Sequence, residues 1–350
     1  MFMTNNFDKD FHQRENPQVT IEQVWNQKSI TLIDARSPDE FLAGFIPEAV
    51  NIPLLNNEER ALVGTLYKQA GREPAIEKGY DLLEPRVGLL ARYFENFSKE
   101  QELVVYCARG GMRSKAITAL MRSLGYRASQ LIGGYKAFRT WNLERLENYQ
   151  LPNLVVLQGG TGVGKTLVLN QLRNSVDLEG LAQHRGSMVG GVGKKPATQK
   201  NFEANLLMAL DCSDPNQVLF VEGESRNIGS TTISGNIHGQ MKRARIAMLE
   251  ASIETRTKRT VEEYITSQPQ ETTEIRKRID FLVKDLGKNK VAELTSLFDA
   301  GNYHDCFQFI LVNYYDRKYA HSMGKLTIEL TVSTEDISEA ARTLEKHFSL

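Results

Sequence analysis

The sequence has few cysteines, no long apolar run and no excess of charge, and each absence excludes a class of protein. Three cysteines in 350 residues (Cys107, Cys212 and Cys306) are too few for a disulfide framework. No apolar run approaches the roughly 20 residues that a membrane-spanning helix needs, and no early segment pairs basic residues with an apolar stretch as a secretory signal does. We therefore expect a protein of the reducing cytoplasm without a membrane role.

Charge is balanced, since lysine plus arginine and aspartate plus glutamate both number 43. A polyanion would have to bind a local basic surface, because the chain as a whole offers no attraction. The hydrophobic fraction of 41% is ordinary for a globular protein.

Short β-rich runs alternate with helical patterns in two series. Residues 29–36, 102–107 and 128–134 predict strands, with a helix over 114–126. The second series predicts strands within 154–157, 217–224 and 243–251, a helical, highly charged stretch over 252–300, and a last strand and helix within 325–348. Ser333 or Thr334 is the predicted N-cap of that last helix.

A polar stretch, residues 143–153, ends in a proline just before the second series. We therefore place a domain boundary near residue 150. The sequence predicts an α/β fold with a parallel α/β domain over 15–145 and a second α/β domain, carrying the helical charged insertion, over 150–350.

The stretch "YCARGGMRSKA" (106–116) places Cys107 at the end of a predicted strand, before a glycine turn into a helix. Backbone N–H groups and the helix dipole point at such a position and favour a thiolate. Arg113 is expected to complete the ring of donors, and Arg109, Gly110 and Gly111 to form an oxyanion loop. The alternative is a buried structural cysteine. Cys212 and Cys306 lack comparable neighbours.

The stretch "GGTGVGKT" (159–166) fits the P-loop pattern directly after a predicted strand and before a helical pattern. Gly159, Gly162 and Gly164 would let backbone N–H groups cradle a diphosphate, Lys165 would reach the terminal phosphate, and Thr166 could hold Mg²⁺.

Three more residues are candidates at the same site. Glu222, at the end of the strand "VLFVE", stands where an acid linked to the metal is expected, so that Mg²⁺ would be held through Thr166 and Glu222. A solvated acid is the alternative. Arg256 and Arg259 are candidate phosphate-binding arginines, or else part of a solvated helix face.

The segment 184–200, "HRGSMVGGVGKKPATQK", has no acidic residue and several glycines. Its Arg185, Lys194 and Lys195 are candidate contacts to an RNA phosphate backbone. An ordinary surface loop is the alternative.

The flanks of the cysteine loop resemble a rhodanese domain: "LIDARSPDEFLAGFIPEAVNIPL" (32–54) resembles its opening and "GGYKAFRTW" (133–141) its closing segment. The resemblance implies that Cys107 is the catalytic thiol and that Asp34 and Arg36 match the family's paired residues near the active loop. Phe45 and Glu48 depart from the usual "GHIPGA", and residues 56–101 form a longer, helical insertion. Cys107 and Arg113 have the C-x5-R spacing of a larger loop, which suits a phosphate-bearing donor.

Together with the P-loop, "YCARGGMRS", "HRGS", "VEGESRNIG" and "NYYDRKY" (313–319) resemble the tRNA 2-selenouridine synthase family over nearly the whole chain. The resemblance implies a transferase acting on 2-thiouridine at the wobble position of tRNAs of the Lys, Glu and Gln type. The sulfur is first geranylated from geranyl diphosphate, and the geranylthio group is then replaced by selenium from selenophosphate through a Cys107 perselenide.

By the same resemblance, the two co-substrates are selenophosphate and geranyl diphosphate, Mg²⁺ is a candidate cofactor, and no tightly bound prosthetic group is expected. A selenophosphate-supplying enzyme is a candidate partner, and a monomer is the simplest oligomeric state.

Two rivals remain open at this point. An ATP-dependent rhodanese-type tRNA sulfurtransferase would couple product formation to ATP turnover. A regulatory phosphatase or phosphate-binding module would need a general acid, and no residue of the sequence stands out for that role.

Overall fold

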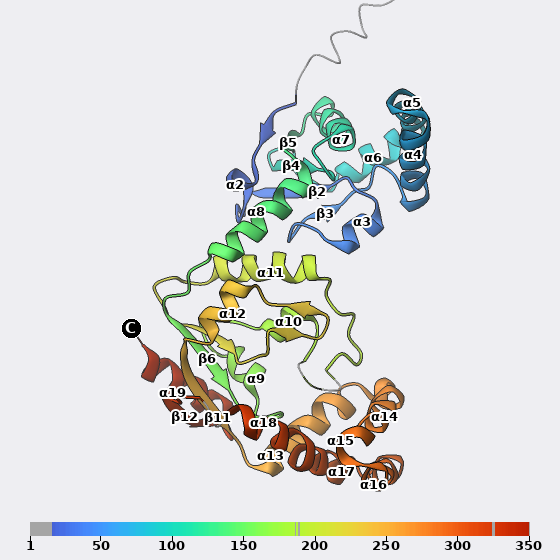
Figure 1. Cartoon of the computed structure of the whole chain (residues 1–350). Coiled ribbons are helices and arrows are strands. Elements are labelled where there is room, and N and C mark those ends of the chain that lie inside the picture. Colours follow the sequence, from blue (N-terminus) through green and yellow to red (C-terminus); the bar gives the residue numbers. More distant parts are fainter. Residues whose placement is uncertain (1–15, 186, 188–189, 324–325, 350) are drawn as a thin grey trace, which may run out of the picture. The chain divides into compact units, whose positions relative to one another are not determined.

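The computed structural model of the chain describes residues 16–185, 187, 190–323 and 326–349. Residue 15, where the predicted first domain begins, and Gly186 of "HRGS" lie outside these ranges. The chain divides into two compact units, Met1–Glu144 and Arg145–Leu350. Each is α/β, as the sequence predicts (Figure 1).

The first unit contains a five-stranded parallel sheet in the order β1-β5-β4-β2-β3. Its strands are β1 (Gln18–Val19), β2 (Ile30–Asp34), β3 (Val50–Asn51), β4 (Glu102–Tyr106) and β5 (Arg127–Leu131). Its helices are α2 (Ile21–Val24), α3 (Pro38–Ala43), α4 (Asn57–Ala70), α5 (Arg72–Leu83), η1 (Glu84–Arg86), α6 (Val87–Phe94), α7 (Met112–Ser123) and α8 (Gly134–Asn148). The three predicted strands are confirmed as β2, β4 and β5.

The insertion between β3 and β4 is helical, as predicted, and consists of α4, α5, η1 and α6. Asn56 caps α4 by accepting a hydrogen bond from the Glu59 N–H, while the Glu59 carboxylate accepts one from the Asn56 N–H. The Glu59 carboxylate also pairs with Arg86 of η1. Helices α4 and α5 pack against each other (Figure 1). Phe94 of α6 is fully buried in the core of the sheet, which fixes the end of the insertion to the fold.

The second unit contains another parallel five-stranded sheet, in the order β12-β11-β6-β8-β7, and a separate antiparallel pair, β9 with β10. The strands are β6 (Leu154–Gln158), β7 (Ser175–Val176), β8 (Leu219–Glu222), β9 (Asn227–Ile228), β10 (Thr231–Thr232), β11 (Arg245–Glu250) and β12 (Leu330–Ser333). The helices outside the insertion are α9 (Lys165–Leu169), α10 (Leu178–Ala182), α11 (Gln199–Cys212), α12 (Gly235–Met241) and α19 (Ile337–Phe348).

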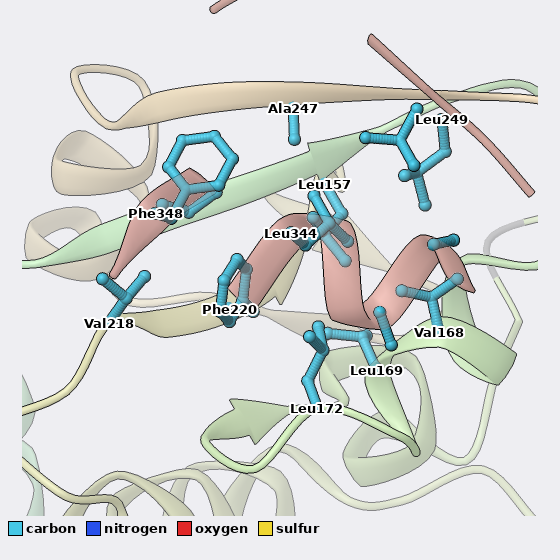
Figure 2. Close-up of a cluster of buried hydrophobic side chains, with 14 of the residues drawn as sticks. Leu157, Val168, Leu169, Leu172, Val218, Phe220, Ala247, Leu249, Leu344 and Phe348 are labelled. Atoms are coloured by element: carbon cyan, nitrogen blue, oxygen red, sulfur yellow. The ribbon is translucent and has the colours of Figure 1, made fainter. Parts of the chain in front are cut away.

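The core of the second unit joins its sheet to α9 and α19. Figure 2 shows Leu344 and Phe348 of α19 and Val168 and Leu169 of α9 gathered around Leu157 of β6. Burial of side chains of this size contributes about 1.5 to 3 kcal/mol each. The core therefore holds α9, and with it the end of the P-loop, against the sheet.

The charged insertion is helical, as predicted, but it extends beyond residue 300. It comprises α13 (Ile253–Val261), the π-helical turn η2 (Glu262–Thr266), η3 (Pro269–Glu271), α14 (Thr272–Asp280), α15 (Val283–Leu286), α16 (Lys288–Asp299), α17 (Tyr303–Ile310), the π-helical turn η4 (Leu311–Tyr315) and α18 (Asp316–Met323). Phe307 and Ile310 of α17 are buried in one apolar cluster with Phe298 of α16, so that both belong to the same subdomain.

The predicted N-cap of the last helix is wrong. Asp336 caps α19 by accepting a hydrogen bond from the Glu339 N–H, whereas Thr334 is buried and bonds to two backbone carbonyls elsewhere in the unit. Within the described ranges, no helix combines the length and apolar character that crossing a membrane requires.

Candidate functional sites

Cys107 follows β4 at the carboxyl edge of the first sheet, and its side chain is 3% exposed. Its Sγ accepts hydrogen bonds from the Gly111 N–H and the Ser114 Oγ–H, each at 3.2 Å. Gly111 is the N-cap of α7, so both donors come from the start of a helix whose dipole favours negative charge. The loop therefore surrounds the sulfur with groups that stabilise a thiolate.

A buried glutamine holds this arrangement in place. Gln130 of β5 donates hydrogen bonds to Gly110 O at 2.7 Å and to Ser114 Oγ at 2.9 Å. Both Gln130 and Ser114 are buried. Because Gln130 supplies a proton to Ser114 Oγ, the hydroxyl proton of Ser114 remains available for the sulfur and for Gly111 O, 3.1 Å away.

The two glycines and the arginine of the loop between Cys107 and α7 have different roles. Gly110 has φ +64°, and a Cβ there would lie 2.9 Å from Leu131 O, so only glycine fits. Gly111 is under no such constraint and contributes its N–H. Arg109 is exposed and lines the cavity described below.

Arg113 pairs with a carboxylate, an arrangement that no local pattern in the sequence predicts. Its Nη1 donates to Glu40 Oε2 of α3 at 2.5 Å. Burial opposes ionisation of Glu40, but the hydrogen bond and charge of Arg113, with smaller contributions from the Ser37 N–H and Arg60, lower its pKa to about 2. The pair holds the guanidinium at the wall of the cavity that contains the thiol.

Asp34 and Arg36 form a buried ion pair behind the loop. Arg36 Nη2 lies 2.6 Å from Asp34 Oδ2 and also donates to Gly44 O. The guanidinium lies 4.0 Å from the ring centroid of Tyr135, whose N–H bonds to Cys107 O. The pair therefore positions the backbone around Cys107.

A cavity of about 450 Å³ opens beside the thiol. Its lining contains Cys107, Arg109, Arg113 and Arg72, together with apolar side chains from the insertion and from the start of α7: Leu54, Leu55, Val63, Ile76, Leu83 and Met112. The described lining residues include no carboxyl group.

In the second unit, the P-loop connects β6 to α9. Lys165 Nζ donates a hydrogen bond to Gly159 O at 3.1 Å. Gly162 has φ +80°, and a Cβ there would lie 2.8 Å from Arg256 O, which explains glycine at this position. Gly164 and Thr166 line the adjacent cavity with Lys165.

The P-loop cavity has a volume of about 540 Å³ and a strongly charged lining. Its cationic residues are Lys165, Arg185, Lys194 and Arg259, and its acidic residues are Asp177, Glu179, Glu224, Glu262 and Glu263. Leu167 and Tyr264 add apolar surface. Such a site suits a diphosphate head group whose charge is shared among several cations.

Arg256 and Arg259 hold the P-loop from behind, through its carbonyl groups. Arg256 Nε donates to Thr161 O at 2.9 Å, and its guanidinium pairs with Asp316 at 2.6 Å. Arg259 Nη1 donates to Val163 O at 2.9 Å. Thr334 Oγ1 donates to the same carbonyl at 2.6 Å. Neither arginine lies on a solvated helix face, and Arg259 alone also lines the cavity.

The acid that faces the cavity from the end of β8 is Glu224, which corrects the expectation for Glu222. Glu222 is buried, its Oε1 accepts a hydrogen bond from the Glu179 N–H, and burial raises its pKa well above the usual range. Burial, followed by the charge of Glu179, raises the pKa of Glu224 to about 7, although Lys165 opposes the shift.

The fit to Mg²⁺ follows from these positions. Among the described residues, no three His, Cys, Asp or Glu side chains gather into a metal-binding group. A hydrated Mg²⁺ that bridges bound phosphates needs only one or two protein oxygens. Thr166, which lines the cavity, is the residue that would hold it.

The basic segment divides between two environments. Arg185 pairs with Glu263 at 2.5 Å and lines the P-loop cavity, as does Lys194, whose pKa is lowered by burial and by the charge of Arg185. Lys195 is exposed. Two of the three candidate RNA contacts therefore face the P-loop cavity.

The structure also reveals residues that the sequence did not single out. Ser114 and Glu224 each lie within a quoted motif, which was the available signal. Gln130 and Glu40 act through contacts with residues far along the chain, and no local pattern marks them.

The folds and sites define a rhodanese-type thiol protein fused to a P-loop domain. A family model described as tRNA 2-selenouridine synthase AAA domain matches residues 152–349, and one described as Rhodanese-like domain matches residues 17–140. The tRNA 2-selenouridine synthase of Hydrogenovibrio crunogenus is 36% identical over 334 residues, covering 87% of this chain and 92% of that protein. The chain therefore belongs to the tRNA 2-selenouridine synthase family.

Other relatives align over a shorter span. The tRNA 2-selenouridine synthase of Pseudomonas syringae pv. syringae is 39% identical over 243 residues, which cover 67% of this chain and 66% of that protein. A rhodanese-related protein of Thermoplasma volcanium, known from a crystal structure, is 19% identical with a TM-score of 0.23, covering 37% of this chain and 92% of that one.

Proposed function

We propose that the protein is a tRNA 2-selenouridine synthase that converts 2-thiouridine at the wobble position of tRNAs of the Lys, Glu and Gln type in two steps. The co-substrates are geranyl diphosphate and selenophosphate, and the reactions take place in the cytoplasm. The observation that carries the proposal is the presence of two unlike sites in one chain, a charged P-loop cavity and a buried thiol at an apolar cavity. Membership of the family supports it.

The P-loop cavity serves the first step. The 2-thio sulfur attacks carbon 1 of geranyl diphosphate, a carbon–sulfur bond forms, and the carbon–oxygen bond breaks with its electron pair on the departing pyrophosphate. Lys165, Arg259 and the P-loop N–H groups stabilise that charge as it develops. This role requires no hydrolysis of ATP.

The first step also releases a proton, because S-alkylation removes the hydrogen from N3 of the base. Glu224 is the candidate acceptor, since it faces the same cavity and its pKa of about 7 suits proton transfer near neutral pH. Mg²⁺, held at Thr166, would supply further charge neutralisation to the diphosphate.

Cys107 serves the second step. Its thiolate takes selenium from selenophosphate: the sulfur–selenium bond forms, and the selenium–phosphorus bond breaks with its electron pair on phosphorus, which leaves as phosphite after protonation. The terminal selenium attacks carbon 2 of the uridine, and the geranylthiolate leaves with the electron pair of the carbon–sulfur bond. A thiol reductant then supplies two electrons to cleave the sulfur–selenium bond, which frees Cys107 and 2-selenouridine.

Two substitutions test the division of labour. Lys165→Ala should slow geranylation by about 100-fold, the cost of one transition-state donor, while selenation of pre-geranylated tRNA persists. Cys107→Ser should accumulate S-geranyl tRNA and form no selenouridine. Both products are quantified by mass spectrometry of the nucleosides. If either substitution abolishes both steps in folded protein that still binds tRNA, the two sites do not divide the reaction.

The phosphorus product tests the carrier role of Cys107 separately. Phosphorus NMR of a selenation reaction should show phosphite in step with selenouridine. Orthophosphate as the sole product would mean that the selenium of selenophosphate attacks carbon 2 directly, which excludes the perselenide and leaves the synthase activity intact.

A further inference from the structure

We propose that the cavity beside Cys107 is the binding site for the geranyl chain of S-geranylated tRNA. The inference rests on the proposed function, because that function supplies the geranylated tRNA. It adds the place where the geranyl chain is bound when the selenium step begins. Nothing in the P-loop or in the hydrogen bonds of the thiol requires such a site.

Apolar side chains from several elements make up much of the lining of the cavity. Val63 of α4, Ile76 and Leu83 of α5, Leu55 after β3 and Met112 of α7 all contribute to it. Its volume of about 450 Å³ lies within the range of small-ligand pockets. A flexible hydrocarbon chain gains free energy when such a surface removes it from water.

Some of these apolar groups are exposed to an unusual degree. Tyr67, Tyr80 and Met112 are 58%, 50% and 46% exposed, and all three line the cavity. Exposed apolar surface that is contiguous around a cavity marks a binding site more often than it marks a defect of packing.

The charges at the cavity define the rest of the ligand. Arg72, Arg109 and Arg113 line it, and no acidic side chain does so among the described residues. Arg113 is partly neutralised by Glu40, whereas Arg72 and Arg109 are exposed. An apolar pocket with a cationic lining complements an apolar chain attached to a polyanion, which is the chemistry of a prenylated RNA.

The P-loop cavity offers the opposite environment, with five acidic side chains and four cations in its lining. It suits the diphosphate of the first step, but it would solvate a detached hydrocarbon chain poorly. After pyrophosphate departs, the chain gains most by entering the cavity that contains the thiol, and this brings the carbon–sulfur bond to be exchanged close to Cys107.

The first experiment compares the affinity of the whole protein for two anticodon stem-loop RNAs, one with S-geranyl-2-thiouridine and one with S-methyl-2-thiouridine. The wild type should prefer the geranyl RNA by about tenfold or more. Tyr80→Glu should reduce this preference toward one, and Met112→Glu, on α7, should do the same.

Tyr93→Glu is the matched control, because Tyr93 of α6 is 47% exposed and does not line the cavity. It should keep the preference. Circular dichroism and urea unfolding establish that each variant is folded. An equal loss in Tyr80→Glu and Tyr93→Glu, or no preference in the wild type, would overturn the proposal.

The second experiment tests whether the geranyl chain lies beside Cys107, by measuring whether it shields the thiol from labelling. The nucleoside S-geranyl-2-thiouridine should slow iodoacetamide labelling of Cys107 and leave the exposed Cys212 unaffected, whereas S-methyl-2-thiouridine should protect neither. If pyrophosphate at the P-loop removes the protection or the geranyl preference, the chain binds in the other cavity and the proposal fails.

These results separate the site from the function. A protein that prefers the geranyl RNA and protects Cys107, yet makes no selenouridine from it, retains the site and loses the proposed function. A protein that makes selenouridine without preference or protection retains the function and loses the site.

Discussion

Ser114→Ala should make Cys107 a weaker nucleophile at neutral pH without changing the fold around it. The hydroxyl lies 3.2 Å from Sγ in a fully buried position, so water cannot replace the lost donor. A hydrogen bond to a charged group contributes about 1.5 to 3 kcal/mol. The lower value applies here, because the Gly111 N–H remains as a second donor and the Ser114 proton is shared with Gly111 O.

A loss of about 1.5 kcal/mol in the stabilisation of the attacking sulfur corresponds to a rate that is lower by up to about tenfold. Alkylation of Cys107 by iodoacetamide at neutral pH, followed by mass spectrometry, should therefore be slower in the variant by up to about tenfold. Thr118→Ala is the matched control, since Thr118 is buried on the same helix and its Oγ1 has no hydrogen-bond partner among the described residues. Equal alkylation rates for wild type and Ser114→Ala would refute the role of the hydroxyl.

Three further predictions concern charge. In single-turnover geranylation, the rate of the wild type should rise with pH through about 7 as the Glu224 carboxyl loses its proton, and Glu224→Gln should lack this rise; a rise that persists in the variant would assign it to another group. The pKa of Glu40 is lowered to about 2, so its pairing stabilises the fold above pH 4.5 and is lost as pH falls toward 2. Allowing for solvent screening, Glu40→Gln should lower the free energy of unfolding by about 1 to 2 kcal/mol at pH 7 and by less below pH 4.5, as urea unfolding would show; a difference independent of pH would contradict the pairing. Lys195→Ala should reduce the salt dependence of tRNA binding by about one counterion, whereas Lys194→Ala should instead weaken pyrophosphate binding, and calorimetry distinguishes the two.

Much of the fold could be predicted, because parallel strands leave continuous apolar runs and because both functional loops follow such runs directly. The strand before Cys107 and the strand before the P-loop were found for this reason. The end of the charged insertion was misjudged, since the helix that continues it after residue 300 is amphipathic and packs into a core that only the fold brings together.

The departure at Glu48 was visible in the sequence, and the structure shows the backbone conformation at this position. Glu48 has φ +63°, in the left-handed region that favours glycine, and the related motif has glycine at this place. A backbone conformation of this kind costs about 1 kcal/mol or more for a residue with a side chain. The sequence could show that position 48 departs from the motif, but it could not show that the backbone there has a positive φ.

The sequence predicted the backbone positions of the candidate sites more completely than the contacts of their side chains. Glycine positions and the lysine of the P-loop follow from the spacing of the motif alone. The partners of Arg113, Arg256 and Arg259 depend on which helices meet, and this contact information is absent from any short stretch. Thr334 illustrates this limit. Its residue type suggested a helix cap, but its side chain is buried and donates a hydrogen bond to the P-loop carbonyl of Val163.

The hydrogen bonds of Arg256 make the helical insertion an inseparable part of the P-loop site. The arginine begins the insertion on α13, its partner Asp316 closes the insertion on α18, and its Nε is bonded to a P-loop carbonyl. If a short linker replaced residues 253–323, the protein would keep its sheet and the whole glycine motif. The P-loop would nevertheless lose Arg256, the side chain that donates a hydrogen bond to its Thr161 carbonyl. A transfer of this P-loop into another protein therefore has to include the strand, the P-loop and the insertion together.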